Sequence, residues 1–217
     1  MDARRERLSR ARLYFVTDVR PGLEKLLAAA LSGGVDMVQL RDKGASDSEL
    51  LRAAEVFRRL CDEHGALFWL NDRPDLAREC GADGVHVGQD DMPVAEARRI
   101  AGDDVLVGLS THSPEQLHAA VADGAADQLS VGPVWETPTK EGRPAAGLDY
   151  VRHAARVAGD RPWFAIGGID LDNVREVTDA GASRVVVVRA IRDADDPRAA
   201  ARALRAALEE ADGGAES

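Results

Sequence analysis

Short apolar runs alternate with amphipathic segments along nearly the whole chain, and this alternation constrains the fold more than any other feature. Strands that are apolar at consecutive positions are buried on both faces, which is typical of parallel sheets covered by helices. The pattern therefore predicts an α/β protein with parallel strands. The eight expected strands are Leu13–Thr17, Val35–Leu40, Leu67–Leu70, Val85–Val87, Val105–Leu109, Gln128–Val131, Trp163–Ile166 and Arg184–Val188.

The segments between these runs have the apolar spacing and the end residues of helices. Ser46 with Glu49, and Ser113 with Gln116, are spaced as capping boxes at two of the helix starts. The expected helices cover Leu23–Ser32, Ser46 to about Gly65, Pro74–Gly81, a segment after Pro93, Ser113–Gly124, Leu148–Val157, Asn173–Ala180 and Pro197–Ala211.

Four similar turns precede every second strand, and they favour a closed barrel. Gly34-Val-Asp, Gly81-Ala-Asp, Gly124-Ala-Ala-Asp and Gly181-Ala-Ser each end a helix just before an even-numbered strand. An open, doubly wound sheet is the alternative, but it normally has a glycine-rich phosphate turn after its first strand, which residues 17–20 lack. We therefore expect one (β/α)₈ TIM-barrel domain over residues 1–217, with an N-terminal helix over 1–12 and a flexible tail over 212–217.

Composition limits the classes of function. The formal net charge of −10 argues against nonspecific nucleic-acid binding, which needs a basic surface. No apolar run approaches the roughly 20 residues of a membrane helix, so we expect neither nucleic-acid nor membrane partners. Cys61 and Cys80 lack metal-site spacing and are typical of buried thiols in a cytoplasmic protein. The sequence leaves open whether the chain forms oligomers.

Acidic residues follow two successive strands in the stretch Leu67–Pro93. Asn71 and Asp72 end one strand, and Asp90 and Asp91 follow the next. A right-handed crossover makes such strands parallel neighbours that end at the same side of the sheet. The carboxylates can therefore converge on one cation, and a site with few protein ligands suits Mg²⁺, which keeps waters and binds substrate phosphates. The alternative is a helix cap at Asp72 and a solvated turn at Asp90 and Asp91.

Further polar residues follow other strands, at the rim where such barrels hold their active sites. Gln39 and Arg41 alternate along the second strand and face the same side, and Lys43 follows them. Cations beside Mg²⁺ ligands can neutralise the charge of a departing diphosphate. The simpler alternative for Arg41 and Lys43 is a pair of solvated side chains at a strand end. The remaining rim residues are Asn71, Ser110, Thr137, Thr139, Lys140, Gly167, Gly168 and Arg189.

The second half of the barrel has features of a separate phosphate site. The missing side chains of Gly167 and Gly168 let backbone amides approach an anion, and barrels of this class often bind phosphate after strands seven and eight. Thr137, Thr139 and Lys140 lie on the long loop Val134–Gly147. Turn geometry alone also explains two adjacent glycines. We therefore expect group transfer between two phosphorylated substrates with loss of pyrophosphate.

Six motifs, in order along the chain, resemble those of the thiamine-phosphate synthase family. These (β/α)₈ transferases join the pyrimidine and thiazole halves of thiamine. The motifs are QLRDK from Gln39, NDRPDLA from Asn71, GADGVHVGQDDMP from Gly81, GLSTHS from Gly108, SVGPVWETPTK ending at Lys140, and AIGGI from Ala165.

The resemblance implies a role for each matching residue. The diphosphate-bearing aminopyrimidine would be bound by Gln39, Arg41, Lys43, Asn71, Ser110 and Lys140, of which Arg41, Lys43, Ser110 and Lys140 would act in catalysis. Mg²⁺ would be bound by Asp72 and Asp91, and the thiazole phosphate by Thr137, Thr139, Gly168, Val188 and Arg189. The implied mechanism is dissociative and Mg²⁺-assisted. It needs no side-chain nucleophile, so His86 and His112 are expected to be structural or substrate-lining.

One position departs from the family pattern, and two related functions are alternatives. Many members have serine at the position of Arg189, whose side chain could add a charged contact to phosphate.

A tautomerase-type paralogue or a non-catalytic sensor would bind thiazole phosphate without coupling it. The tautomerase-type paralogues use a histidine where this chain has Pro133, which counts against that alternative. Isomerases and epimerases need a general base over a carbon acid, and no residue is better placed for that role than the expected metal ligands.

Overall fold

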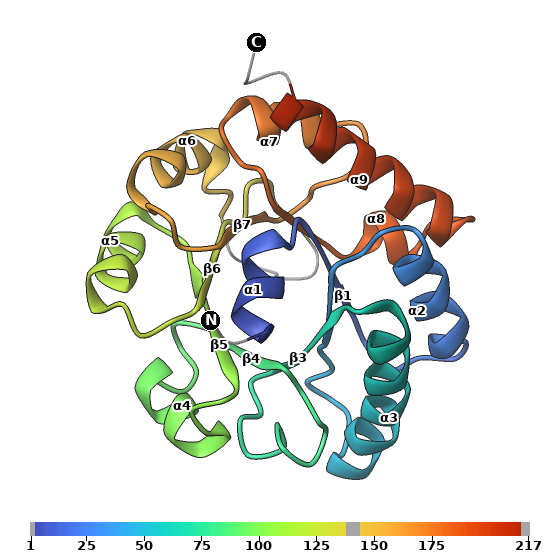
Figure 1. Cartoon of the computed structure of the whole chain (residues 1–217). Coiled ribbons are helices and arrows are strands. Elements are labelled where there is room, and N and C mark those ends of the chain that lie inside the picture. The colour runs from blue at the N-terminus through green and yellow to red at the C-terminus, as the bar shows by residue number, and fades with distance from the viewer. Residues whose placement is uncertain (1–2, 138–143, 214–217) are drawn as a thin grey trace.

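The computed structural model describes residues 3–137 and 144–213, and within them eight parallel strands close into a barrel (Figure 1). The strands pair in chain order, and β8 returns to β1. The expected fold class is thus confirmed. The strands are β1 (Leu13–Thr17), β2 (Met37–Leu40), β3 (Leu67–Asn71), β4 (Gly84–Val87), β5 (Leu106–Thr111), β6 (Gln128–Val131), β7 (Trp163–Ile166) and β8 (Val185–Val187).

Helices surround the barrel, and most of them lie where the sequence predicts. Among the described helices, none has the length and apolarity needed to cross a membrane. The helices are α1 (Ala3–Arg10), α2 (Leu23–Ser32), α3 (Asp47–His64), α4 (Val94–Ala101), α5 (Pro114–Asp123), α6 (Gly147–Val157), α7 (Val174–Asp179), α8 (Arg189–Arg192) and α9 (Pro197–Gly213). Of these, the short α8 has no counterpart among the expected elements.

The segment between β3 and β4 differs from expectation, because it is a series of turns and not an α-helix. Cys80 N–H donates to Leu76 O as in a helix, but Leu76 and Gly81 bond to residues three positions earlier. A helix this short has little stability of its own, so tertiary contacts decide its geometry. Leu76 and Ala77 are buried here, and the turns bury them without a regular helix.

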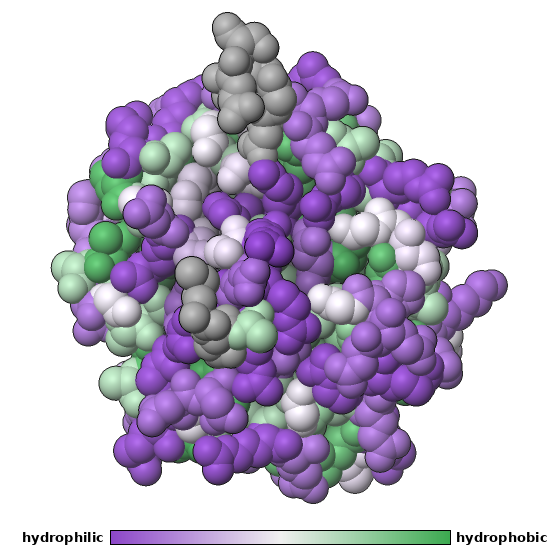
Figure 2. Space-filling view, viewed as in Figure 1, coloured by the Kyte–Doolittle hydropathy of each residue, from purple (hydrophilic) through white to green (hydrophobic). Residues whose placement is uncertain are grey.

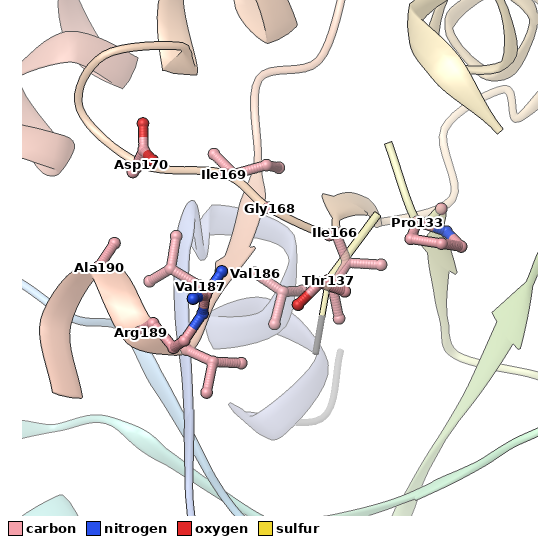
Figure 3. A pocket seen from close by; sticks show the side chains of 13 residues that line it. Pro133, Thr137, Ile166, Gly168, Ile169, Asp170, Val186, Val187, Arg189 and Ala190 are labelled. Atoms are coloured by element: carbon pink, nitrogen blue, oxygen red, sulfur yellow. The ribbon is translucent and has the colours of Figure 1, made fainter. Parts of the chain in front are cut away.

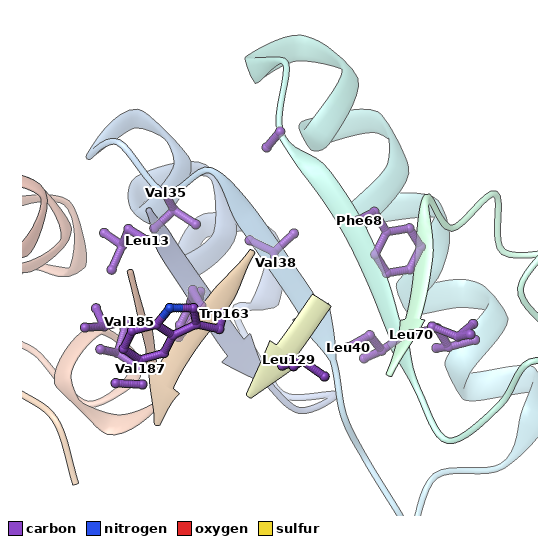
Figure 4. Close-up of a cluster of buried hydrophobic side chains, with 14 of the residues drawn as sticks. Leu13, Val35, Val38, Leu40, Phe68, Leu70, Leu129, Trp163, Val185 and Val187 are labelled. Carbon is purple, nitrogen blue, oxygen red and sulfur yellow. The ribbon is translucent and has the colours of Figure 1, made fainter. Parts of the chain in front are cut away.

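Two apolar layers form the core. The outer layer lies between the strands and the helices and includes Phe68 on β3 (Figure 4). The ring centroid of Phe68 is 5.0 Å from that of Phe57 on α3. The inner layer fills the barrel with large side chains. Tyr14 is central there, with ring centroids 6.1 Å from Trp69 and 5.7 Å from Phe164. The filled interior confines any ligand to the ends of the strands.

Helix α1 lies across the middle of the ring of helices (Figure 1), and Leu8 extends this inner layer from it. On α1, Arg4 Nε donates to Asp83 Oδ1 at 3.0 Å, and Arg5 Nη2 donates to Asp127 Oδ1 at 3.0 Å. Asp83 and Asp127 precede even-numbered strands, so α1 covers the end of the barrel where the strands begin. The space-filling view from the same side shows mainly hydrophilic residues around it (Figure 2).

The aspartates of three repeated turns each link an even strand to the odd strand before it. Asp83 Oδ2 accepts from Phe68 N–H at 2.9 Å and pairs with Arg58 of α3 at 2.9 Å. Asp127 Oδ2 accepts from Val107 N–H at 2.9 Å and pairs with Arg98 at 2.6 Å. Each aspartate therefore joins two strands and the helix that precedes the first of them.

The same arrangement includes the two ends of the chain. Asp36 Oδ2 accepts from Leu13 N–H at 3.0 Å, and its arginine partner is Arg205 of α9. The fourth turn has Ser183 in place of an aspartate. Three of the four repeated turns are therefore carboxylate anchors, and one of them connects the first strand pair to the last helix.

Candidate active site

Two adjoining cavities open at the ends of the strands opposite α1. The polar cavity, of about 250 Å³, is lined mainly by residues on β1 to β6 or directly after them, including Lys43, Asp72 and Ser110. The glycine cavity, of about 280 Å³, lies at the ends of β6, β7 and β8 (Figure 3). The two cavities share the side chains of Ile166, Val186 and Val188 as a common wall.

The two predicted metal-binding aspartates converge in the polar cavity. Lys43 Nζ lies 3.0 Å from Asp72 Oδ2 and 3.8 Å from Asp91 Oδ1. Burial raises the pKa of Asp72, the hydrogen bond from Lys43 lowers it, and the nearby charge of Asp91 raises it again. Both carboxylates therefore face the Lys43 ammonium group, and the position between them favours a cation.

The backbone holds Asp72 in an unusual conformation. Its φ of 58° is the single left-handed value of a non-glycine residue in the described part of the chain. Asp72 N–H donates to His86 O at 2.9 Å, and Asn71 Nδ2 donates to Asp72 Oδ2 at 2.6 Å. Aspartate tolerates this region better than most residues, and such conformations concentrate at functional sites. The strand end is therefore bent so that the carboxylate faces Lys43.

The donor set tests whether a metal ion fits. Within residues 3–137 and 144–213, no group of three or more histidine, cysteine and acidic side chains could hold a metal. Asp72 and Asp91 thus offer two carboxylates without further protein ligands of these types. This set suits Mg²⁺, which keeps several waters and commonly binds through one or two carboxylates together with substrate phosphates.

Gln39 and Arg41 both line the polar cavity, as their alternation predicts. Gln39 Nε2 donates to the hydroxyl oxygen of Tyr14 at 2.5 Å. Burial raises the pKa of Tyr14, and the hydrogen bond from Gln39 lowers it less, so the phenol stays neutral. Tyr14 therefore anchors the Gln39 amide at the floor of the cavity.

A chain of buried polar groups supports Ser110. His86 Nε2 lies 2.9 Å from Ser110 Oγ, and His86 Nδ1 lies 3.2 Å from Gln128 Oε1. Gln128 Nε2 donates to Ser130 Oγ at 3.0 Å. From outside this buried chain, the exposed Gln89 donates its Nε2–H to the backbone oxygen of Ser110 at 2.7 Å. The hydroxyl of Ser110 is thus fixed from below by His86.

The glycine cavity is built around a sharp turn after β7. Gly167 and Gly168 have φ values of 111° and 70°, and a Cβ on Gly168 would meet the Trp135 side chain at less than 3.0 Å. Only glycine combines this conformation with so close a neighbour. Thr137, Arg189 and the turn at Gly168 are arranged around the cavity (Figure 3).

The structure brings together the predicted site residues that it describes. The polar cavity is lined by Gln39, Arg41, Lys43, Asn71, Asp72, Asp91 and Ser110, and the glycine cavity by Thr137, Gly168, Val188 and Arg189. Thr139 and Lys140 lie outside the described residues.

Other lining residues have no specific role in the sequence-based prediction. In the sequence, Tyr14 has the features of an ordinary strand residue. Gln89 is an uncharged residue directly before Asp90 and Asp91. The position of Gln89 just after β4 could have indicated it, whereas Tyr14 lies near the start of β1 and no signal in the sequence marks it. His86 and His112 line the polar cavity, one of the two placements expected for them.

Comparisons with known proteins agree with this geometry. Residues 13–191 match the family described as thiamine monophosphate synthase. The chain is 58% identical over 204 residues to the thiamine-phosphate synthase of Acidothermus cellulolyticus. This alignment covers 93% of this chain and 96% of that protein. It is 57% identical over 203 residues to the enzyme of that name from Thermus thermophilus, with 91% and 97% covered.

A solved structure supports the same assignment. The thiamine phosphate pyrophosphorylase from Pyrococcus furiosus superposes with a TM-score of 0.85 at 35% identity, covering 95% of this chain and 98% of that one. The similarity thus spans both cavities and all eight strands. The resemblance of the six sequence motifs is confirmed, and the chain belongs to the thiamine monophosphate synthase family.

Proposed function

We propose that the chain couples an aminopyrimidine with a diphosphooxymethyl group to a thiazole phosphate, or its carboxylated form, and releases thiamine phosphate and pyrophosphate. The observation that supports this most directly is the pair of cavities with a shared wall. One contains cations and carboxylates suited to a diphosphate, and the other contains a glycine turn suited to a monophosphate. Family membership supports the same reaction.

In this proposal the polar cavity holds the diphosphate substrate. Asp72 and Asp91 would hold Mg²⁺, which when bound neutralises charge on the diphosphate. Arg41 and Lys43 line the same cavity and would contribute further positive charge to the leaving group. Lys140, which lies outside the described residues, would add to it. Asn71 holds the Asp72 carboxylate in place through its 2.6 Å hydrogen bond.

The reaction we propose is dissociative. The bond between the methylene carbon and the diphosphate oxygen breaks, and its electron pair leaves with the diphosphate. The resulting methylene cation is stabilised by the electron-rich aminopyrimidine. The lone pair of the thiazole nitrogen then forms the new carbon–nitrogen bond. This chemistry requires charge stabilisation and orientation, which Gln39 and Ser110 would supply.

The glycine cavity would orient the second substrate. Its phosphate would be bound by the backbone at Gly168 and at Val188 and Arg189, and Thr137 and Thr139 would contact the thiazole. Because Val188 borders both cavities, the thiazole nitrogen and the methylene carbon would meet at the common wall.

We further propose that the reaction takes place in the cytoplasm, which is supported by the free thiols of Cys61 and Cys80.

Direct turnover tests the proposal. Purified protein is incubated with both substrates, with and without Mg²⁺, and thiamine phosphate and pyrophosphate are quantified. We expect both products in equal amounts and only when Mg²⁺ is present. Tight binding of thiazole phosphate without coupling would instead support a sensor or a tautomerase-type protein.

A further inference from the structure

The buried hydrogen bonds below Ser110 span three neighbouring strands in register. His86 on β4 pairs with Gly108 on β5, and Gly108 pairs with Gln128 on β6. A residue with a side chain at the middle position would separate the other two. A Cβ on Gly108 would lie less than 3.0 Å from both Gln128 Oε1 and His86 Nδ1. The glycine therefore lets the His86 ring and the Gln128 amide meet across β5.

The orientation of the Gln128 amide determines where the proton of His86 lies. Gln128 is fully buried, and its Nε2 donates to Ser130 Oγ, which leaves Oε1 facing His86 Nδ1 at 3.2 Å. An amide oxygen only accepts, so Nδ1 must donate. In the tautomer with its proton on Nδ1, Nε2 is an acceptor, and the Ser110 hydroxyl, 2.9 Å away, donates to it.

The direction of these hydrogen bonds determines whether Ser110 Oγ can accept a hydrogen bond from a ligand or donate one to it. Because its proton points to His86, the lone pairs of Ser110 Oγ face the polar cavity. An oxygen in this state binds an N–H group and does not pair with an unprotonated ring nitrogen. The aminopyrimidine of the proposed reaction has both kinds of group, and its amino group alone donates.

We propose that Gln128 is a positioning residue which, through His86, makes Ser110 Oγ an acceptor for the amino N–H of the aminopyrimidine. The inference rests on the proposed function for the identity of this amine. As the diphosphate leaves, the amino nitrogen donates electrons to the ring and its N–H becomes a stronger donor. The hydrogen bond to Ser110 thus strengthens toward the transition state and raises kcat more than it lowers KM.

The first measurement needs no turnover and no variant of Gln128. The protein is labelled with ¹⁵N-histidine, and the His86 ring signals are identified by their loss in His86→Asn. We expect the proton on Nδ1 and an unprotonated, hydrogen-bonded Nε2. A ring with its proton on Nε2 would overturn the inference, because Ser110 would then be free to donate to the substrate.

Two variants change the tautomer from different strands. Gln128→Met removes the acceptor but keeps an unbranched side chain, and Gly108→Ala separates the ring from the amide. For both we expect signals of the Nε2-protonated tautomer and a kcat about 3- to 10-fold lower, the effect of one neutral hydrogen bond. KM for the diphosphate substrate should change less than about 2-fold.

Thr111→Val is the matched control. Thr111 is next to Ser110 on β5 and equally buried, but its Oγ1 donates to Ser130 O and accepts from Tyr150, away from the cavity. It should lower thermal stability and leave kcat and the His86 tautomer unchanged. If Thr111→Val lowered kcat as much as Gln128→Met, general destabilisation would explain the loss and the inference would be wrong. Absence of coupling in the wild-type protein would instead refute the proposed function.

Discussion

Asp83 anchors the covered end of the barrel, and its removal should cost a large part of the stability. Its carboxylate is 4% exposed and accepts from Phe68 N–H at 2.9 Å. It also pairs with Arg58 at 2.9 Å and with Arg4 at 3.0 Å. In Asp83→Ala the buried N–H of Phe68 loses its partner, at a cost of about 1–3 kcal/mol.

The arginines add to this loss only in part. Arg58 and Arg4 remain partly exposed and keep contacts with Asp62 and Asp104, so each lost pair should contribute about 1 kcal/mol, below the 3–5 kcal/mol of a fully buried pair. We expect Asp83→Ala to lower the free energy of unfolding by about 3–5 kcal/mol. For a chain of this length that corresponds to about 6–20 °C in Tm.

Urea unfolding followed by tryptophan fluorescence measures this difference. The control is Asp104→Ala, because Asp104 also contacts Arg4, at 3.7 Å, but its side chain is 71% exposed. Its removal should change the unfolding free energy by less than about 0.5 kcal/mol. A loss below about 1 kcal/mol for Asp83→Ala, similar to the control, would refute the view that these aspartates hold the strand pairs together.

Further predictions concern the site and the thiols. Asp72→Ala should lower Mg²⁺-dependent turnover by about 100-fold or more with an unchanged circular dichroism spectrum; full activity would exclude Asp72 as a metal ligand. Arg189→Ser should raise KM for thiazole phosphate by about 10-fold without lowering kcat at saturation, because a charged hydrogen bond is lost; an unchanged KM would mean that only backbone groups bind the phosphate. Burial raises the pKa of Cys61 to about 12 and that of Cys80 to about 11, so neither thiol should react with a disulfide reagent at pH 8 until urea unfolds the chain. Both pKa values lie above the unfolded value of 9.0, so above pH 9 the folded state keeps protons that the unfolded state releases. The free energy of unfolding should therefore fall as the pH rises above 9, which unfolding experiments at several pH values measure.

The barrel could be predicted from the sequence because its signals are local and repeated. The strand runs are apolar on consecutive positions, and Gly34, Gly81, Gly124 and Gly181 all have positive φ values in the structure. The segment 74–81 was the exception, because Pro74 and Gly81 mark the ends of a helix but do not supply the stability that keeps a short one regular. Residues at the strand ends were predictable for a related reason: parallel strands place their ends on one rim.

The supporting residues could not be predicted in the same way. Gln128 begins a strand whose other members are apolar or small, and no spacing in the sequence connects it to His86, 42 positions earlier. Their contact depends on the absence of a side chain at Gly108 and on the register of three strands. Likewise, the left-handed backbone of Asp72 depends on a hydrogen bond to the next strand, and no property of Asp72 alone predicts it.

The anchor at Asp36 has a consequence for the synthesis of the chain. In the two other anchors, the arginines come from α1 and from the helix that precedes the strand pair, so they are translated before the aspartate that they contact. Asp36 instead pairs with Arg205, 169 residues later. The first strand pair therefore lacks the arginine of its anchor until α9 is translated. The ring itself closes where β8 pairs with β1, and Arg205 then secures that closure from the helix that follows.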